Sequence, residues 1–168
     1  MRTPTQLHIL VGTTGDKALN AAKAAAQALS NTFTHIEVTK LTPDHGIAVF
    51  GQVHDGAKKL FIVCSSTHGS GDVPDNAQAL LASLDLEPTF LGHVRYGLMA
   101  LGDSSYGATY AAGAKLLDAK LQDLGAQRLG VMFEHDASGL DDADEMAAQW
   151  ATVWATDWAK NTVQPTAE

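Results

Sequence analysis

Short apolar runs recur along the chain, and segments with helical spacing separate them. Runs of this length, bounded by glycine or polar residues, are typical of buried strands. The second run alternates more and carries a charge, as an edge strand does. The five predicted strands are Leu7–Val11, Phe33–Val38, Leu60–Cys64, Tyr96–Leu101 and Arg128–Phe133.

Between these runs, apolar residues repeat at three- and four-residue steps, which predicts amphipathic helices. Asp16 can cap the first of them, and Gly125 is the expected stop of the third. Only a short helix and a loop are predicted between Pro43 and Gly56. The predicted helices run over about Ala18–Leu29, Asn76–Leu84 and Thr109–Leu124, and a last one carries Met146, Trp150, Trp154 and Trp158.

A tryptophan every four residues on the last helix has two interpretations. The stripe could line a cofactor, or it could pack the helix against the sheet. We favour packing, because indoles bury a large apolar area.

Strands that alternate with helices predict an α/β fold: a parallel sheet with helices on both faces. We expect a doubly wound sandwich with the five-stranded order 2-1-3-4-5. One domain is expected over residues 1–162, with a tail at 163–168.

Composition and charge argue against several classes of function. The net charge of −8 argues against nucleic acid and anionic membranes as partners. No apolar run reaches the roughly 20 residues of a spanning helix, and no signal peptide is visible. The single cysteine, Cys64, excludes an internal disulfide and is expected in the core. We therefore expect a cytoplasmic protein. A monomer is expected as well.

Three polar loops follow the first, third and fourth predicted strands. They are Gly12–Lys17, Ser65–Asn76 and Gly102–Ala108. In the expected order these strands are neighbours, and their carboxyl ends flank the switch point where ligands bind. The sequence therefore predicts one ligand site built by three loops.

The loops differ in chemistry. Glycines, hydroxyls and a helix start in the first loop suit a monophosphate, since the loop has neither GxxxxGK[ST] nor GxGxxG spacing. His68 and Tyr106 lie among small residues, where flat side chains can meet a planar ligand. A phosphate cradle with two flat side chains predicts a flavin mononucleotide (FMN) site.

Other chemistries find little support. The seven histidines form no HxxxH pair and do not cluster with Cys64. Asp72 and Asp75 are interpreted as loop-closing and helix-capping residues. The loop serines lack the GxSxG elbow of a hydrolase.

Two motifs carry a family resemblance. Ser66–Asn76 (STHGSGDVPDN) resembles the STYGEGDxxDN loop of diflavin reductase FMN domains, and more closely the loop of MioC-type short-chain flavodoxins. Leu101–Tyr106 (LGDSSY) resembles a second loop of the same family. The resemblance covers almost the whole chain and implies a flavodoxin-like fold with FMN as the cofactor. It implies that Tyr106 stacks on the flavin, that His68 borders it and that Gly69 can turn its carbonyl toward it.

The residues that the loops and the resemblance together assign to FMN lie in all three loops. They are Gly12, Thr13, Thr14, Gly15, Asp16, Lys17, Ser66, Thr67, His68, Gly69, Ser70, Gly71, Asp72, Gly102, Asp103, Ser104, Tyr106 and Tyr110.

The leading hypothesis is an FMN-binding one-electron carrier rather than an enzyme with its own substrate. It would take electrons from an NAD(P)H-dependent reductase and pass them to an acceptor redox enzyme. Asp136, Asp141 and Asp142 would steer the partner. The alternative is a flavodoxin-like scaffold with weak or lost FMN binding, which Gly12 and Asp16 keep open. A flavin-dependent quinone reductase is disfavoured by the short chain.

Overall fold

The computed structural model describes residues 5–13, 16–50, 58–66, 74–86, 90–102, 112–136 and 142–163. Within these ranges a single sheet has the order β2-β1-β3-β4-β5, and β6 also pairs with β4. This order confirms the predicted 2-1-3-4-5, with β6 as an additional strand, and every pairing is parallel, as predicted. The strands are β1 (Thr5–Gly12), β2 (His35–Lys40), β3 (Lys58–Ser65), β4 (Arg95–Gly102), β5 (Gln127–Arg128) and β6 (Phe133–Asp136).

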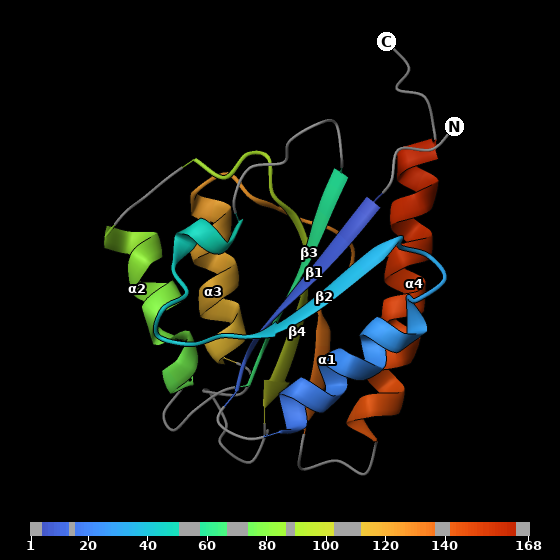
Figure 1. Ribbon diagram of the computed structural model, residues 1–168, viewed down its shortest axis with the longest axis horizontal. Helices are drawn as coiled ribbons and strands as arrows, with labels where there is room; N and C mark the ends of the chain where they lie inside the picture. The colour runs from blue at the N-terminus through green and yellow to red at the C-terminus, as the bar shows by residue number, and fades with distance from the viewer. Residues whose placement is uncertain are drawn as a thin grey trace.

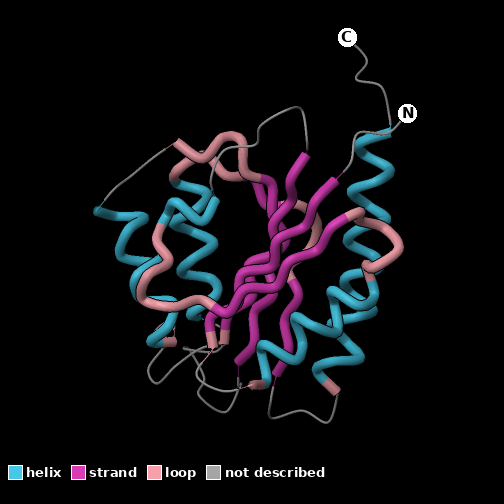
Figure 2. Tube along the Cα trace, in the orientation of Figure 1, coloured by secondary structure: helices cyan, strands magenta, loops and turns pink. Residues whose placement is uncertain are grey.

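Helices cover both faces of the sheet. In Figure 1, α1 and α4 lie on one side, and α2 and α3 lie on the other. Figure 2 shows the strands as a twisted layer between these two groups. The described helices are α1 (Lys17–Ala28), α2 (Gln78–Leu86), α3 (Ala112–Asp123) and α4 (Ala143–Val163), with short 3-10 turns η1 (Ile47–Phe50) and η2 (Asp75–Ala77).

Two apolar cores result, one on each face. Alternate residues of a strand point to opposite faces, so Ile9 and Val11 join the core under α1 and α4, while Leu10 joins the core under α2 and α3. Alanines at 18, 21, 22 and 25 let α1 approach the sheet closely. The near-continuous apolar strands are explained by this burial on both sides.

The fifth strand differs from the prediction. It was expected as one strand over Arg128–Phe133, but it consists of β5 and β6 with a break between them. Gly130 in the break has a φ of 68°, which takes the backbone out of the extended conformation. The carbonyls of Leu129 and Val131 accept hydrogen bonds from the indole N–H groups of Trp154 and Trp150. Tryptophans of α4 thus bind the peptide groups of the break.

The packing role predicted for the tryptophan stripe is confirmed. Trp154 is buried in the core beneath α1 and α4, and Trp150 and Trp158 pack against that core. Met146, at the start of the stripe, is partly exposed. The stripe therefore fixes α4 to the sheet along most of its length.

Helix ends follow the sequence except at the two aspartates expected as caps. Asp75 lies inside η2, whose N-cap residue is Pro74 and has no side-chain capping hydrogen bond. Gly125 has a φ of 99° just after α3, as a helix-stopping glycine does. Asp16 is the N-cap residue of α1, but its side chain makes no capping hydrogen bond, so that expectation is wrong. Cys64 is fully buried, as expected. Helix α4 continues to Val163; residues 109–111 and 164–168, assigned from sequence to a helix start and the tail, lie outside the described residues.

Among the described residues, no helix combines the length and the apolar character that crossing a membrane requires.

Candidate functional site

The carboxyl ends of β1, β3 and β4 lie side by side. Gly12 at the end of β1 is in register with Ser65 of β3, and Ser65 is in register with Ala100 of β4. The backbone N–H of Ser66 donates to the carbonyl of Gly12 at 3.0 Å, one residue beyond the ladder. The starts of the three polar loops therefore meet at one edge of the sheet, as the sequence predicts.

Gly12 is required by the close approach of the turn η2. A Cβ atom at Gly12 would lie 2.8 Å from the Cβ of Ala77, a distance that real Cβ atoms essentially never show. The turn that starts α2 thus packs directly on the end of β1. A serine or threonine at this position would force the two segments apart.

Asn76 ties the third-strand loop to the first loop. Its Oδ1 accepts a hydrogen bond from the backbone N–H of Thr13 at 3.0 Å, across 63 residues of sequence. Thr13 itself is almost completely buried. A buried N–H needs a partner, so this contact fixes the first loop where it leaves β1.

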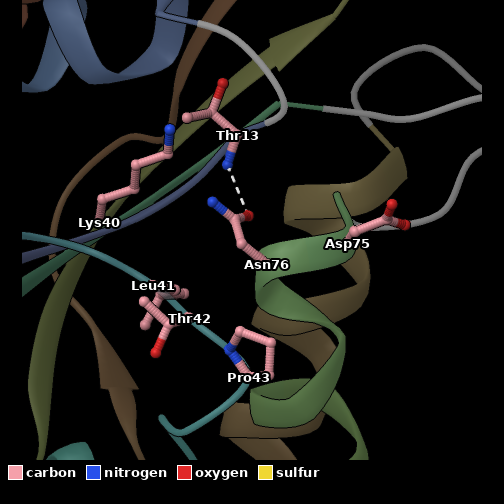
Figure 3. Close-up of a pocket in the computed structure, with 7 residues that line it drawn as sticks. All are labelled: Thr13, Lys40, Leu41, Thr42, Pro43, Asp75 and Asn76. Atoms are coloured by element: carbon pink, nitrogen blue, oxygen red, sulfur yellow. Dashed lines mark hydrogen bonds between the residues drawn. The ribbon is translucent and has the colours of Figure 1, made fainter.

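A cavity of about 440 Å³ lies beside this contact. Its volume falls in the range of small-molecule sites, roughly 300–1,000 Å³. Figure 3 shows the lysine of its wall extending toward Thr13, and the Asp75 carboxylate pointing away from it. The lining residues are Thr13, Lys40, Leu41, Thr42, Pro43, Asp75 and Asn76.

Four of the lining residues, Lys40 to Pro43, were not predicted from the sequence. Lys40 is the last residue of β2 and the other three follow it, in a segment that is less rich in glycine and hydroxyls than the three polar loops and so gave no signal. Only the register shows their position: Lys40 pairs with Val11, and the N–H of Leu41 donates to the carbonyl of Val11 at 2.8 Å. The segment after β2 thereby reaches the start of the first loop.

The predicted cofactor residues are described only in part. Asp16 and Lys17 are exposed at the start of α1, and neither lines the cavity. Ser66 is half-buried, and Gly102 is in register with Asp136. Outside the described residues lie Thr14, Gly15, Thr67, His68, Gly69, Ser70, Gly71, Asp72, Asp103, Ser104, Tyr106 and Tyr110.

Cys64 lies one residue before the site but belongs to the core. Burial raises the pKa of its thiol to about 12, and its Sγ lies 3.6 Å from the carbonyl of Ala18. Such a thiol stays protonated at neutral pH and does not act as a nucleophile. Within the described part of the chain, histidine, cysteine and acidic residues form no group of three that could hold a metal ion.

Acidic residues flank the same edge of the sheet at β6 and α4. Asp136 ends β6 opposite the last residue of β4, and Asp142 precedes α4. Asp144 and Glu145 are exposed in the first turn of that helix. Asp141, assigned to the same group, lies outside the described residues.

Comparison with known proteins agrees with this geometry. The flavodoxin family model matches residues 9–150. Flavodoxin YqcA of Pectobacterium carotovorum is 33% identical over 145 residues, which cover 86% of this chain and 91% of that protein. A solved point mutant of flavodoxin from Pseudomonas aeruginosa superposes with a TM-score of 0.72 at 29% identity, covering 90% of this chain and 97% of the other.

Shorter matches support the resemblance seen in the loops. Protein MioC of Escherichia coli is 31% identical over 94 residues, 56% of this chain and 63% of MioC. Methionine synthase reductase of Bos taurus is 46% identical over 70 residues, 40% of this chain and 10% of that protein. The family model spans the sheet from β1 to the middle of α4, so the chain belongs to the flavodoxin family.

Proposed function

We propose that this chain binds FMN and carries electrons singly from an NAD(P)H-dependent reductase to an acceptor redox enzyme. The main observation that supports this proposal is that the carboxyl ends of β1, β3 and β4 lie side by side. In a doubly wound sheet this edge, at the switch point, is where a ligand binds. Membership of the flavodoxin family supports FMN as that ligand.

The described wall of the site fits a phosphorylated ligand. An ammonium group, an amide and hydroxyls line the cavity beside Thr13, and Leu41 and Pro43 add apolar surface. Asn76 holds the backbone of the first loop at its start. The wall thus offers cationic and hydrogen-bonding groups beside a fixed loop.

FMN supplies the redox chemistry when it is bound, and the protein supplies binding, orientation and electrostatics. In our proposal the loop Gly12–Lys17 binds the phosphate. The loop that contains His68 and Gly69 borders one side of the ring system, and Tyr106 stacks on the other. This division of roles follows from the family motifs in the sequence.

Docking is proposed to use the acidic edge beside β6. Asp142, Asp144 and Glu145 are exposed at the start of α4, and Asp136, which ends β6, lies beside the end of β4, the strand that runs into the LGDSSY loop. A partner with a basic surface would be steered to this edge, which places it near the proposed flavin. We also propose that the protein works as a monomer in the cytoplasm.

The test is a titration of the purified protein with FMN, followed by flavin fluorescence and absorbance. We expect quenching that saturates at one FMN per chain, and shifted flavin bands in the complex. Unchanged fluorescence across the titration would contradict the carrier function. That result would favour the alternative of a flavodoxin-like scaffold that acts through protein contacts.

A further inference from the structure

Lys40 occupies a fixed place beside the first loop. It is the last residue of β2, and its backbone is in register with Val11 of β1. The hydrogen bond from Leu41 to Val11 closes the ladder directly after it, at 2.8 Å. The backbone of Lys40 is therefore held beside Val11, which precedes Thr13 of the first loop by two residues.

The side chain of Lys40 is directed toward that loop. Partners in a parallel ladder point to the same face, so Lys40 shares the face of Val11, which packs beneath α1. Figure 3 shows the extended Lys40 side chain reaching toward Thr13, and both residues line the same cavity.

Lys40 has no ion-pair partner among the residues that the structure describes. Lys115 and Lys120, by contrast, pair with Glu134 and Asp85 at 3.5 Å and 2.8 Å. The carboxylate of Asp75 lines the cavity but points away from Lys40. The ammonium group is therefore available to an anion that enters beside Thr13.

Lys17, the lysine of the loop itself, is placed differently. It is exposed at the first position of α1 and does not line the cavity. The loop also carries Asp16, whose exposed side chain makes no capping hydrogen bond and adds a negative charge near any bound phosphate. A cation from outside the loop would offset that charge.

We propose that Lys40 binds the phosphate of FMN and so makes the chain select FMN over riboflavin, an inference that rests on the proposed FMN-binding function. The lysine compensates the acidic residue of the loop with a cation from the neighbouring strand. Its contribution is a charge-assisted contact to phosphate oxygens. Riboflavin, which has the same ring system and no phosphate, cannot make this contact.

The test compares FMN and riboflavin affinities of Lys40 variants. For Lys40→Gln we expect the Kd for FMN to rise about three- to tenfold at low ionic strength, the range between an exposed ion pair and a charge-assisted hydrogen bond. The Kd for riboflavin should stay within about twofold of its value in the unchanged protein, and Lys40→Arg should retain most of the FMN affinity. Added salt should reduce the difference in the Kd for FMN between the unchanged protein and Lys40→Gln, because salt screens the charge.

Lys23→Gln is the matched control. Lys23 is exposed on α1, so its substitution removes the same charge away from the cavity, and FMN affinity should not change. If the unchanged protein binds FMN and Lys40→Gln binds it equally well, the role proposed for Lys40 is wrong and the FMN-binding function stands. A loss of FMN and riboflavin affinity in equal measure would likewise overturn it. If the unchanged protein binds neither flavin, both the proposed FMN-binding function and the role of Lys40 are wrong.

Discussion

Asn76 joins two loops through a single acceptor atom. Its Oδ1 is the partner of the Thr13 N–H, and both residues line the cavity. Gly12 allows this geometry, because any side chain there would push η2 away from β1. The family motif marks Asn76 in the sequence, but its partner becomes visible only when β1 and η2 are placed together.

Asn76→Ala should lower both stability and FMN affinity. A partly buried N–H left without its acceptor costs about 1–3 kcal/mol in the free energy of unfolding. The matched control is Asn76→Asp, which keeps an oxygen for the Thr13 N–H but adds a negative charge beside the proposed phosphate site. We expect it to restore stability and to bind FMN more weakly still. Chemical denaturation and FMN titration measure the two effects, and equal stability of all three proteins would contradict the argument.

His8 provides a pH-dependent contribution to stability. It lies on β1 with its side chain 12% exposed, near the ring of Phe61 and 2.8 Å from the Thr39 hydroxyl. Burial lowers the pKa of His8 below its ordinary value, although Glu37 opposes the shift. The folded pKa is thus below the unfolded one. The stability from neutral His8 is present above about pH 6.5 and is lost as the pH falls through that value toward the folded pKa.

We therefore expect His8→Gln to flatten the pH dependence of unfolding. The free energy of unfolding, measured by urea denaturation at about pH 7.5 and 5.5, should fall less in this variant than in the unchanged protein. His93→Gln, at an exposed histidine, is the control and should follow the unchanged protein. If the free energy of unfolding falls by the same amount in the His8 variant, protonation of His8 does not contribute to the pH dependence of stability.

At the scale of elements, α4 and β4 meet at a glycine. A Cβ atom at Gly97 would lie 2.7 Å from Nε1 of Trp154 and 3.0 Å from Cη2 of Trp150. The Trp154 indole cannot retreat freely, since its N–H donates to the carbonyl of Leu129 at 3.0 Å. The tryptophan stripe thus requires a glycine on the strand beneath it.

Gly97→Ala should destabilise the fold by about 1–3 kcal/mol, the usual cost of overpacking a core. The control is Gly46→Ala, where the new Cβ would meet the Ser83 Cβ and Oγ atoms at 3.4 Å, close to ordinary contact. That variant should remain near the unchanged protein in thermal unfolding. A Gly97 variant as stable as the control would show that α4 can shift away from β4.

The elements and their order could largely be predicted, because buried strands and amphipathic helices leave clear periods in the sequence. The break between β5 and β6 could not be predicted from the sequence. Its apolar residues have a strand composition, and the break depends on hydrogen bonds from Trp150 and Trp154, which lie about twenty residues further along the chain. Long-range contacts of this kind leave no local pattern.

The site was predictable where chemistry was concentrated in loops, and only there. Thr13, from the first of the three polar loops, lines the cavity, and Gly12 directly precedes it. Lys40 was missed because a charged residue at the end of an edge strand is ordinary, and its position depends on the pairing of β1 with β2. A parallel sheet brings strand ends together from distant parts of the sequence, so residues without a motif can share a site.

At the scale of the whole molecule, the charge is distributed unevenly. The net charge is −8, and exposed acids gather at the start of α4, beside the edge of the sheet that carries the site. Asp123 and Asp157, also exposed, lie near the opposite ends of α3 and α4. Those ends lie away from the site, because both helices run back from the carboxyl edge of the sheet. The two groups of acids allow a test of docking at constant net charge.

The double variant Asp144→Asn, Glu145→Gln should slow reduction of the FMN-loaded protein by a basic NAD(P)H-dependent reductase. We expect the association rate at low salt to fall about two- to tenfold, and its dependence on salt to weaken, because charges at the edge of an interface act mainly on encounter. Stopped-flow reduction across a salt series measures both. The pair Asp123→Asn, Asp157→Asn removes the same charge at the opposite edge and should leave the rate close to that of the unchanged protein. Equal slowing by both pairs would mean that net charge, rather than the acidic edge beside β6, guides the partner.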